Sequence, residues 1–268
     1  MSAPGPSRAT AAADGRGGPA GSLPAALAQV ARVPTLLVAL DFDGVLAPIV
    51  ADPSTSRPLP GSAAAIRALA ELPGTTVVLV SGRALGDLRA VAGFDAPVRL
   101  VGSHGGEFDD GGLVLTDEQS LVKAELEAAV RSVVDGEPGV RLEEKPAGIV
   151  VHVRGADDAV AARVLDAVRA GPARLPGVEA TEGKAVLEMA VVQVSKGAAI
   201  DTLRERLGAD AVLFVGDDVT DETGFARLGP GDVGIKVGDG ATGAGYRVGT
   251  PEDVTAVLEQ LLAARRGR

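Results

Sequence analysis

The chain has no cysteine, no tryptophan, one tyrosine, five phenylalanines and two histidines. Without cysteine, disulfides, thiolate metal sites and cysteine nucleophiles are excluded, and two histidines are too few for a multi-histidine zinc site. The scarcity of aromatic residues predicts a core built from Ala, Val and Leu. It also argues against a base-stacking surface for single-stranded nucleic acid.

The sequence also lacks long apolar runs and an excess of positive charge. No apolar stretch approaches the roughly 20 residues of a membrane-spanning helix. Its 26 basic and 36 acidic residues give a formal charge of −10, so we expect neither nucleic acid nor a membrane surface as a partner. Residues 1–22 are rich in Ala, Gly, Pro and Ser without the apolar centre of a secretory signal. They predict a disordered tail on a cytoplasmic protein.

Short apolar runs alternate with helix-like segments over much of the 268 residues. Residues 35–40, TLLVAL, are typical of a strand buried on both faces of a parallel sheet. Four further strands are expected, at 75–80, 98–101, 211–215 and 233–237. Helices are expected at 61–72, 84–91, 196–207 and 251–264. The alternation predicts an α/β fold with a Rossmann-like parallel sheet.

The middle of the chain has a different order of predicted helices and strands. Helices are expected at 121–134 and 157–170, and strand-like segments at 140–144, 149–154, 178–181 and 185–189. The order helix-strand-strand-helix-strand-strand predicts a small α+β module over an antiparallel sheet. We therefore expect a tail (1–22), a first part of the core (23–116), an inserted α+β domain (117–190) and a second part of the core (191–268).

Polar side chains follow three of the predicted strands at their carboxyl ends. These ends carry Asp41 and Asp43, Ser81, and Asp217 and Asp218. Ligands of open α/β sheets bind outside the carboxyl ends of the strands, so these groups are expected in one crevice. Clustered carboxylates repel one another unless a cation offsets the charge, and oxygen ligands select Mg²⁺ over zinc or copper. At the start of a later helix, Lys196 offers a positive charge to an anionic substrate.

The pair Asp41 and Asp43 suits one kind of chemistry. An aspartate beside Mg²⁺ can attack phosphorus and form an aspartyl phosphate. In an extended segment Asp43 shares the face of Asp41, where it can protonate the leaving oxygen and later activate water. Taken alone, Asp-x-Asp-Gly is as typical of a turn. Its occurrence with Ser81, Lys196 and Asp217-Asp218, in this order, favours phosphoryl transfer.

Five segments carry a resemblance to a known family: DFDGVLAPI (41–49), VSGR (80–83), GSHGGE (102–107), SKG (195–197) and GDDVTDE (216–222). With them the sequence resembles the haloacid dehalogenase-like phosphatases, and within these the trehalose-phosphate phosphatase family, over about residues 36–264. The resemblance implies a Mg²⁺-dependent phosphatase of a disaccharide phosphate, with trehalose 6-phosphate as the leading candidate. It also implies a parallel-sheet core with a smaller inserted cap that closes over the sugar.

The resemblance implies a role for each matching core residue. Asp41 would be the nucleophile and Asp43 the general acid/base, while Ser81 and Lys196 would hold the phosphoryl group. Three aspartates would bind the metal: Asp41, Asp43 through its backbone carbonyl, and Asp217. Two more would be outer ligands or partners of the lysine: Asp218 and Asp221. This division suits phosphoryl transfer, in which positioning and charge neutralisation carry most of the catalysis.

The insertion offers charged residues for a sugar. By resemblance, five of them would grip sugar hydroxyls: Glu143, Lys145, Arg154, Lys184 and Glu188. Alternate residues of a strand project to one face, so such groups can converge on a disaccharide. The alternative is a solvated, charged face of a sheet. Gly82 and Arg83, next to the phosphate serine, are further candidates for substrate contact, although Arg83 also suits a surface position at a helix start.

Some positions depart from the family pattern. Val45 stands where the family usually has threonine, Val153 where the cap usually has tyrosine, and Met189–Val191 where it usually carries Arg-Pro. These departures leave the phosphatase groups intact but keep other substrates open: sucrose phosphate, a glycosylglycerate phosphate, or an aminocyclitol-derived pseudo-disaccharide phosphate. A non-catalytic sugar-phosphate sensor is the alternative from another class. We expect a monomer whose partner is a small sugar phosphate.

Two remaining features have mainly structural interpretations. His104 lies among glycines, where a histidine commonly packs or hydrogen-bonds, although contact with the substrate is the alternative. The glycine-rich segment 238–245 lacks the strand and helix context of a nucleotide-binding loop. It is expected to be an ordinary connection near the mouth of the site.

Overall fold

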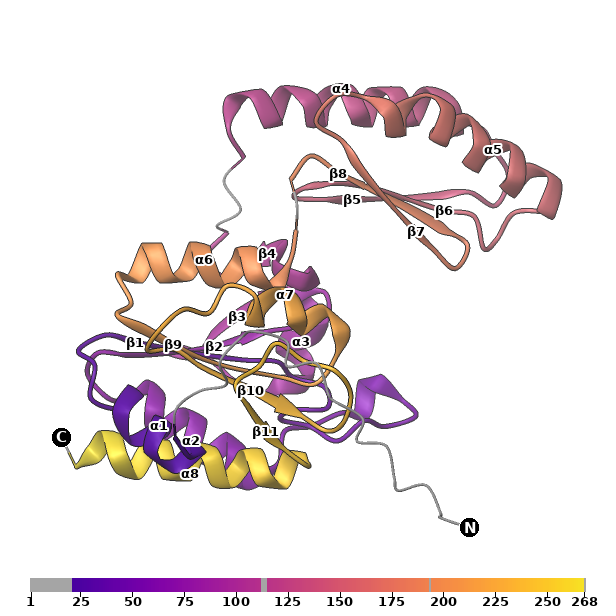
Figure 1. Ribbon diagram of the computed structural model, residues 1–268. Helices are drawn as coiled ribbons and strands as arrows, with labels where there is room; N and C mark the ends of the chain where they lie inside the picture. Colours follow the sequence, from indigo (N-terminus) through magenta and orange to yellow (C-terminus); the bar gives the residue numbers. More distant parts are fainter. Residues whose placement is uncertain (1–20, 112–114, 193, 268) are drawn as a thin grey trace, which may run out of the picture.

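The computed structural model describes residues 21–111, 115–192 and 194–267, which form two separate β-sheets (Figure 1). Except for residues 21 and 22, the predicted tail lies outside the described residues. The predicted α/β fold is confirmed. Among the helices of these described ranges, none has the length and apolarity needed to cross a membrane.

The larger sheet has seven strands in the order β11-β10-β9-β1-β2-β3-β4, and β4 alone is antiparallel to its neighbour. Its strands are β1 (Leu36–Leu40), β2 (Thr75–Val80), β3 (Arg99–Gly102), β4 (Glu107–Phe108), β9 (Ala211–Gly216), β10 (Val233–Val237) and β11 (Tyr246–Val248). β1 is central, because the chain proceeds to β2 and β3 on one side and later to β9 and β10 on the other. The order of the strands thus reverses at β1, where open α/β sheets bind their ligands.

Helices cover both faces of this sheet. One face packs against α1 (Leu23–Val30), α2 (Pro60–Ala70), α3 (Leu85–Ala92) and α8 (Pro251–Arg266). The other packs against α6 (Lys196–Leu207) and α7 (Glu222–Phe225). Along β1, Leu36, Val38 and Leu40 enter the first core, whereas Leu37 and Ala39 enter the second. Burial on both faces explains why the sequence of this strand is continuously apolar.

The smaller sheet has four antiparallel strands in the order β5-β6-β8-β7. They are β5 (Arg141–Lys145), β6 (Gly148–His152), β7 (Glu179–Gly183) and β8 (Val186–Ala190). Two helices, α4 (Asp117–Val134) and α5 (Asp158–Ala170), pack on one face through a core that includes Leu126, Ile149 and Met189. In Figure 1 these helices lie on the side of the sheet away from the larger sheet, which leaves the opposite face toward it.

The predicted elements lie within a few residues of those observed, and four helices and strands were missed: α1, α7, β4 and β11. α7 has only four residues. α1 follows directly on the low-complexity start of the chain, and its apolar residues were not assigned to a helix. β4 and β11 have two and three residues, too few for a periodic pattern. The proposed division into domains stays a prediction.

Candidate active site

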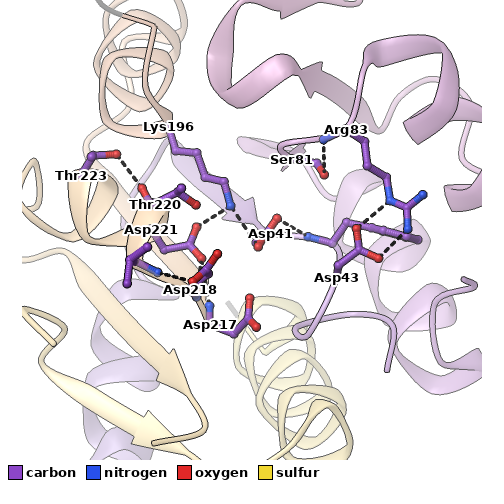
Figure 2. Close-up of polar contacts among 12 residues, drawn as sticks. Asp41, Asp43, Ser81, Arg83, Lys196, Asp217, Asp218, Thr220, Asp221 and Thr223 are labelled. Carbon is purple, nitrogen blue, oxygen red and sulfur yellow. Dashed lines mark hydrogen bonds and ion pairs between the residues drawn. The ribbon is translucent and has the colours of Figure 1, made fainter. Parts of the chain in front are cut away.

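Three carboxylates meet at the carboxyl ends of the central strands (Figure 2). Asp41 follows β1, Asp217 follows β9, and Asp221 ends a 3₁₀ turn at Val219–Asp221. One oxygen of each lies within 4.8 Å of the others. Asp41 and Asp221 are buried, with 6% and 0% of their surface exposed. β1 and β9 are parallel neighbours with Leu40 opposite Val215, so Asp41 and Asp217 both follow at the same edge of the sheet.

Lys196 supplies the positive charge of this carboxylate cluster. Its Nζ lies 2.9 Å from Asp41 Oδ2 and 2.7 Å from Asp221 Oδ1, and only 2% of its side chain is exposed. Asp221 was expected as an outer ligand or as a partner of the lysine, and in the structure it contacts the lysine directly. Burial opposes the charge on Lys196, but the ion pairs with Asp41 and Asp221 prevail and raise its pKa above 10.5.

The environment of the carboxylate cluster shifts the pKa values of its aspartates. Burial raises the pKa of Asp41 to about 8; Lys196 opposes this rise and Asp221 adds to it. Burial and Asp221 also raise the pKa of Asp217. Three carboxylates against one ammonium leave excess negative charge, which a divalent cation would offset. The donors are all oxygens, so the residues fit a hard cation such as Mg²⁺.

Gly44, in the segment after β1, allows the backbone to lie close to the Asp217 side chain. Its φ is +78°, in the left-handed region, and a Cβ placed there would lie 2.0 Å from Asp217 Oδ2. Any side chain would therefore displace Asp217 and strain the backbone. The glycine of the Asp-x-Asp-Gly sequence thus belongs to the carboxylate cluster as well as to a turn.

Asp43 lies apart from the carboxylate cluster and is held by Arg83. The guanidinium donates from Nε to Asp43 Oδ2 at 2.6 Å and from a terminal nitrogen to Oδ1 at 2.7 Å. Ser56 Oγ donates to the same Oδ1 at 3.1 Å, and the Arg83 guanidinium lies 5.6 Å from the centre of the Phe42 ring. Arg83, predicted as a substrate contact or a surface residue, is a partner of Asp43 (Figure 2), and its contact with a substrate stays a prediction.

Most of the predicted core site residues line one cavity of about 540 Å³. Its lining includes Asp41, Asp43, Ser81, Gly82, Arg83, Lys196, Asp217 and Asp218. Ser81 is buried at the end of β2, and its Oγ accepts a hydrogen bond from the Arg83 backbone N–H at 3.2 Å. Asp218 borders the cavity, but its carboxylate caps the backbone N–H of Val219 at 2.7 Å and is outside the group of three carboxylates.

The charged candidates of the smaller sheet are partly gathered on its uncovered face. Glu143 and Glu188 oppose Val150 in one cross-strand row, which places both on the face opposite the apolar core. Lys145 Nζ lies 3.4 Å from Glu188 Oε1. Glu143 pairs with His152 instead, at 2.8 Å. Two further candidates are exposed at the ends of strands: Arg154 after β6, and Lys184 in the turn between β7 and β8.

Several residues near the site were not among the predicted site residues. Lys236 is buried on β10 and donates to the backbone carbonyls of Asp217 and Val237. Ser56 binds Asp43, and no local motif marks it. His104 lines the cavity, although its main interpretation was structural. The glycine-rich segment 238–245 is a connection as predicted, but Gly243 and Gly245 line a separate cavity with Tyr246, and no residue of the segment lines the carboxylate cavity.

Comparisons with known proteins agree on one family. A family model described as trehalose-phosphatase matches residues 39–245. A trehalose-phosphate phosphatase of Mycobacterium ulcerans is 34% identical over 260 residues, which cover 89% of this chain and 66% of that protein. A bifunctional trehalose-6-phosphate synthase/phosphatase of Thermoproteus tenax is 34% identical over 242 residues, covering 86% of this chain and 32% of that protein. The chain thus spans about two thirds of one relative and a third of the other.

Solved structures resemble the fold over nearly its whole length. A trehalose-6-phosphate phosphatase of Aspergillus fumigatus aligns with a TM-score of 0.66 at 26% identity, covering 92% of this chain and 99% of that chain. A trehalose-6-phosphate phosphatase related protein aligns with a TM-score of 0.57 at 27% identity, covering 86% and 99%. Both sheets therefore lie within the region of similarity.

Proposed function

The chain belongs to the trehalose-phosphatase family, and from this we propose that it is a phosphoric monoester hydrolase that releases phosphate from a disaccharide phosphate, with trehalose 6-phosphate as the leading candidate. The division into a core (23–116 and 191–268) and an inserted cap (117–190) is part of the proposal. The observation that carries it is the cluster of Asp41, Asp217, Asp221 and Lys196 at the reversal point of the larger sheet.

The first step transfers the phosphoryl group to the protein. A carboxylate oxygen of Asp41 attacks phosphorus, an O–P bond forms to Asp41, and the bond from phosphorus to the sugar oxygen breaks. Asp43 gives its proton to that oxygen, which leaves as a hydroxyl. The Phe42 N–H at 2.7 Å and the Lys196 ammonium hold the Asp41 carboxylate in place and favour its charged form.

The second step releases inorganic phosphate. Asp43, now a carboxylate, takes a proton from a water molecule, whose oxygen bonds to phosphorus while the bond to Asp41 breaks. Ser81 and Lys196 would hold the phosphoryl oxygens in both steps. Bound Mg²⁺, held by Asp41, Asp217 and the Asp43 carbonyl, would neutralise the charge of the phosphoryl group. The rise in the pKa of Asp41 supports this requirement, because the nucleophile must be ionised.

The cap face supports a sugar as the leaving group. A second cavity, of about 380 Å³, is lined by Glu188 and Thr181 of the smaller sheet. Ser195 and Thr223 of the core also line it. Carboxylates and hydroxyls are the groups that bind sugar hydroxyls in pairs. The proposed contacts remain those predicted from the sequence: Glu143, Lys145, Arg154, Lys184 and Glu188.

One observation favours a related sugar phosphate as the second candidate. Of the residues 189–191 that depart from the family pattern, Met189 and Val191 belong to the cap core. Ala190 instead lines the cavities on the uncovered face, beside Glu188. A small side chain there leaves room next to the sugar. The same chemistry on a sucrose, glycosylglycerate or pseudo-disaccharide phosphate is therefore the alternative.

Phosphate release from a panel of these sugar phosphates tests the proposal. The assays run with Mg²⁺ and with EDTA, and Asp41→Asn is the blank. Asp217→Asn and Asp218→Asn form a matched pair, because only Asp217 belongs to the carboxylate cluster. We expect Asp217→Asn to need at least about 10-fold more Mg²⁺ for half-maximal activity, by the usual cost of losing a metal-orienting group. Asp218→Asn should need about the same concentration as the wild type.

Each outcome separates the candidates. Preference for trehalose 6-phosphate by orders of magnitude, lost in EDTA, supports the first candidate. Mg²⁺-dependent release with a preference for another sugar supports the second. Activity that persists in Asp41→Asn contradicts the aspartyl-phosphate step. A wild-type protein that binds these sugar phosphates but releases no phosphate is a sensor and overturns the proposal.

A further inference from the structure

His104 lies where two cavities meet. It lines the 540 Å³ cavity that contains Asp41 and Ser81, and also the 380 Å³ cavity that contains Glu188 and Thr181. No other described residue lines both. A substrate with its phosphate in the first cavity and its sugar in the second would therefore extend past the His104 side chain. The portion of the substrate that carries the phosphate must pass beside the imidazole.

The backbone holds His104 in an unusual conformation. Ser103 and His104 have φ values of +49° and +56°, so two successive non-glycine residues occupy the left-handed region. The His104 N–H donates to the carbonyl of Ser81 at 2.9 Å, which ties this loop to the end of β2. Glu107 accepts hydrogen bonds from Ser103 Oγ at 2.5 Å and from the Leu85 N–H at 3.0 Å. These contacts therefore fix the backbone from which the His104 side chain projects.

Gly82 leaves the space that the imidazole occupies. A Cβ at Gly82 would lie 2.5 Å from Cε1 of the ring, so any larger residue would push the ring out of place. None of the described residues hydrogen-bonds to either ring nitrogen. Burial and the charge of Lys196 lower the pKa of His104, so the ring is neutral at physiological pH. A neutral imidazole offers one donor and one acceptor.

From these contacts we propose that His104 is a specificity residue: it hydrogen-bonds the sugar unit that carries the phosphate, at a hydroxyl or at the ring oxygen. The proposal rests on the proposed function, since it concerns the sugar of the same substrate. On this proposal, His104 makes the protein prefer sugar phosphates to phosphate esters without hydroxyl groups. Such a contact would raise the affinity for the sugar more than it would affect the phosphoryl transfer itself.

The left-handed backbone alone does not explain a histidine here. Glycine and asparagine occupy this region at least as readily, and neither would need the space above Gly82. His104→Asn therefore keeps a residue suited to this backbone while it removes the imidazole. His104→Gly removes the whole side chain and relieves the conformation, which guards against a variant that fails to fold.

The test compares three substrates for the wild type and both variants: trehalose 6-phosphate, glucose 6-phosphate and p-nitrophenyl phosphate. We expect kcat/KM to fall about 10-fold or more for both sugar phosphates, mainly through KM, as for loss of a hydrogen bond at a buried group. The ratio of sugar-phosphate to p-nitrophenyl phosphate activity should fall by a similar factor. Equal losses on all three substrates, or no loss, would overturn the proposal.

A binding measurement on the wild type needs no variant of His104. The chain has two histidines, so NMR shows two imidazole Cε1–H signals, and His152→Gln identifies them. Added glucose 6-phosphate, with EDTA to prevent turnover, should shift the His104 signal more than inorganic phosphate does. Equal shifts would contradict the proposal. Failure of the proposed function would be seen separately, as the absence of phosphate release from every sugar phosphate by the wild type.

Discussion

Asp41 is buried, although the proposed mechanism requires its carboxylate to be charged. Burial raises its pKa to about 8 in the protein without metal, although Lys196 opposes the rise. In the proposed mechanism a protonated Asp41 could not attack phosphorus, so a bound cation would be needed to restore its charge. On this proposal the residue would link metal binding, catalysis and stability.

The raised pKa predicts how stability depends on pH. Unfolded aspartate loses its proton near pH 4, so between about pH 4 and 8 the folded protein binds more protons than the unfolded chain. The free energy of unfolding should therefore fall as the pH rises through this range. In Asp41→Asn the fall should be shallower, by up to about 1.4 kcal/mol per pH unit. Urea unfolding in EDTA at pH 5, 6, 7 and 8 measures this, and parallel curves for the two proteins would contradict it.

Arg83 gives a second prediction at the scale of the residue. Because its guanidinium holds both oxygens of Asp43, Arg83→Gln should lower kcat about 10- to 100-fold on a sugar phosphate. This is less than the full contribution of a general acid, because Asp43 itself is retained. KM should change little. The loss should shrink with p-nitrophenyl phosphate, whose leaving group needs no proton. Arg89→Gln, on the exposed side of α3, is the control; a loss confined to KM would instead assign Arg83 to substrate binding.

At the scale of the element, the end of α8 joins the N-terminal half of the larger sheet. Arg265 is buried, and its guanidinium donates to Thr75 Oγ1 and to the carbonyls of Ala31, Val33 and Gly74. It therefore ties α8 to the segment after α1 and to the start of β2. One side chain thus donates hydrogen bonds to several backbone carbonyls from two parts of the chain.

Arg265→Met should test this arrangement. Methionine fills a similar length but removes every hydrogen bond that the buried guanidinium donates, and we expect the free energy of unfolding to fall by about 3 kcal/mol. Chemical denaturation measures the change. Arg266→Met, on the exposed side of the same helix, should change it by less than about 0.5 kcal/mol. Equal effects of the two variants would show that Arg265 has no special role.

The elements that the sequence predicted well share one property: their residues repeat a simple pattern. β1, β2 and α6 have continuous or periodic apolar residues, and the acids after β1 and β9 follow from strand order. The contacts of Arg83 and His104 could not be predicted in this way. Asp43 and Arg83 are 40 positions apart, and the space for the imidazole depends on a glycine of another loop. Such pairings arise from tertiary packing, which no local pattern encodes.

At the scale of the whole molecule, the protein has separate apolar cores. The buried residues of the smaller sheet and its helices form a cluster that shares no described residue with the two clusters of the larger sheet. We call the larger sheet with its helices the larger part, and the smaller sheet with α4 and α5 the smaller part. Each part has the internal apolar contacts that an independently stable unit needs. The carboxylate cluster belongs to one part and most candidate sugar contacts to the other.

Separate cores predict that the two parts unfold separately. Leu126→Ala, in the core of the smaller sheet, should destabilise that part by about 2–5 kcal/mol and leave the unfolding of the larger part nearly unchanged. Calorimetry should then show a second, earlier transition. Leu121→Ala is the control, because Leu121 lies on the same helix and is 73% exposed. A single transition that shifts as one would contradict the prediction.

The burial of Lys196 has a consequence for chemical labelling. The chain has five lysines, and the two in the larger part, Lys196 and Lys236, are only 2% and 4% exposed. The other three, Lys123, Lys145 and Lys184, all belong to residues 117–190. Activated esters acylate exposed amines and leave guanidinium groups untouched, and the larger part carries arginine at its surface. Apart from the α-amino group, a single acylation reaction would therefore place a dye or a cross-linker on the smaller part alone.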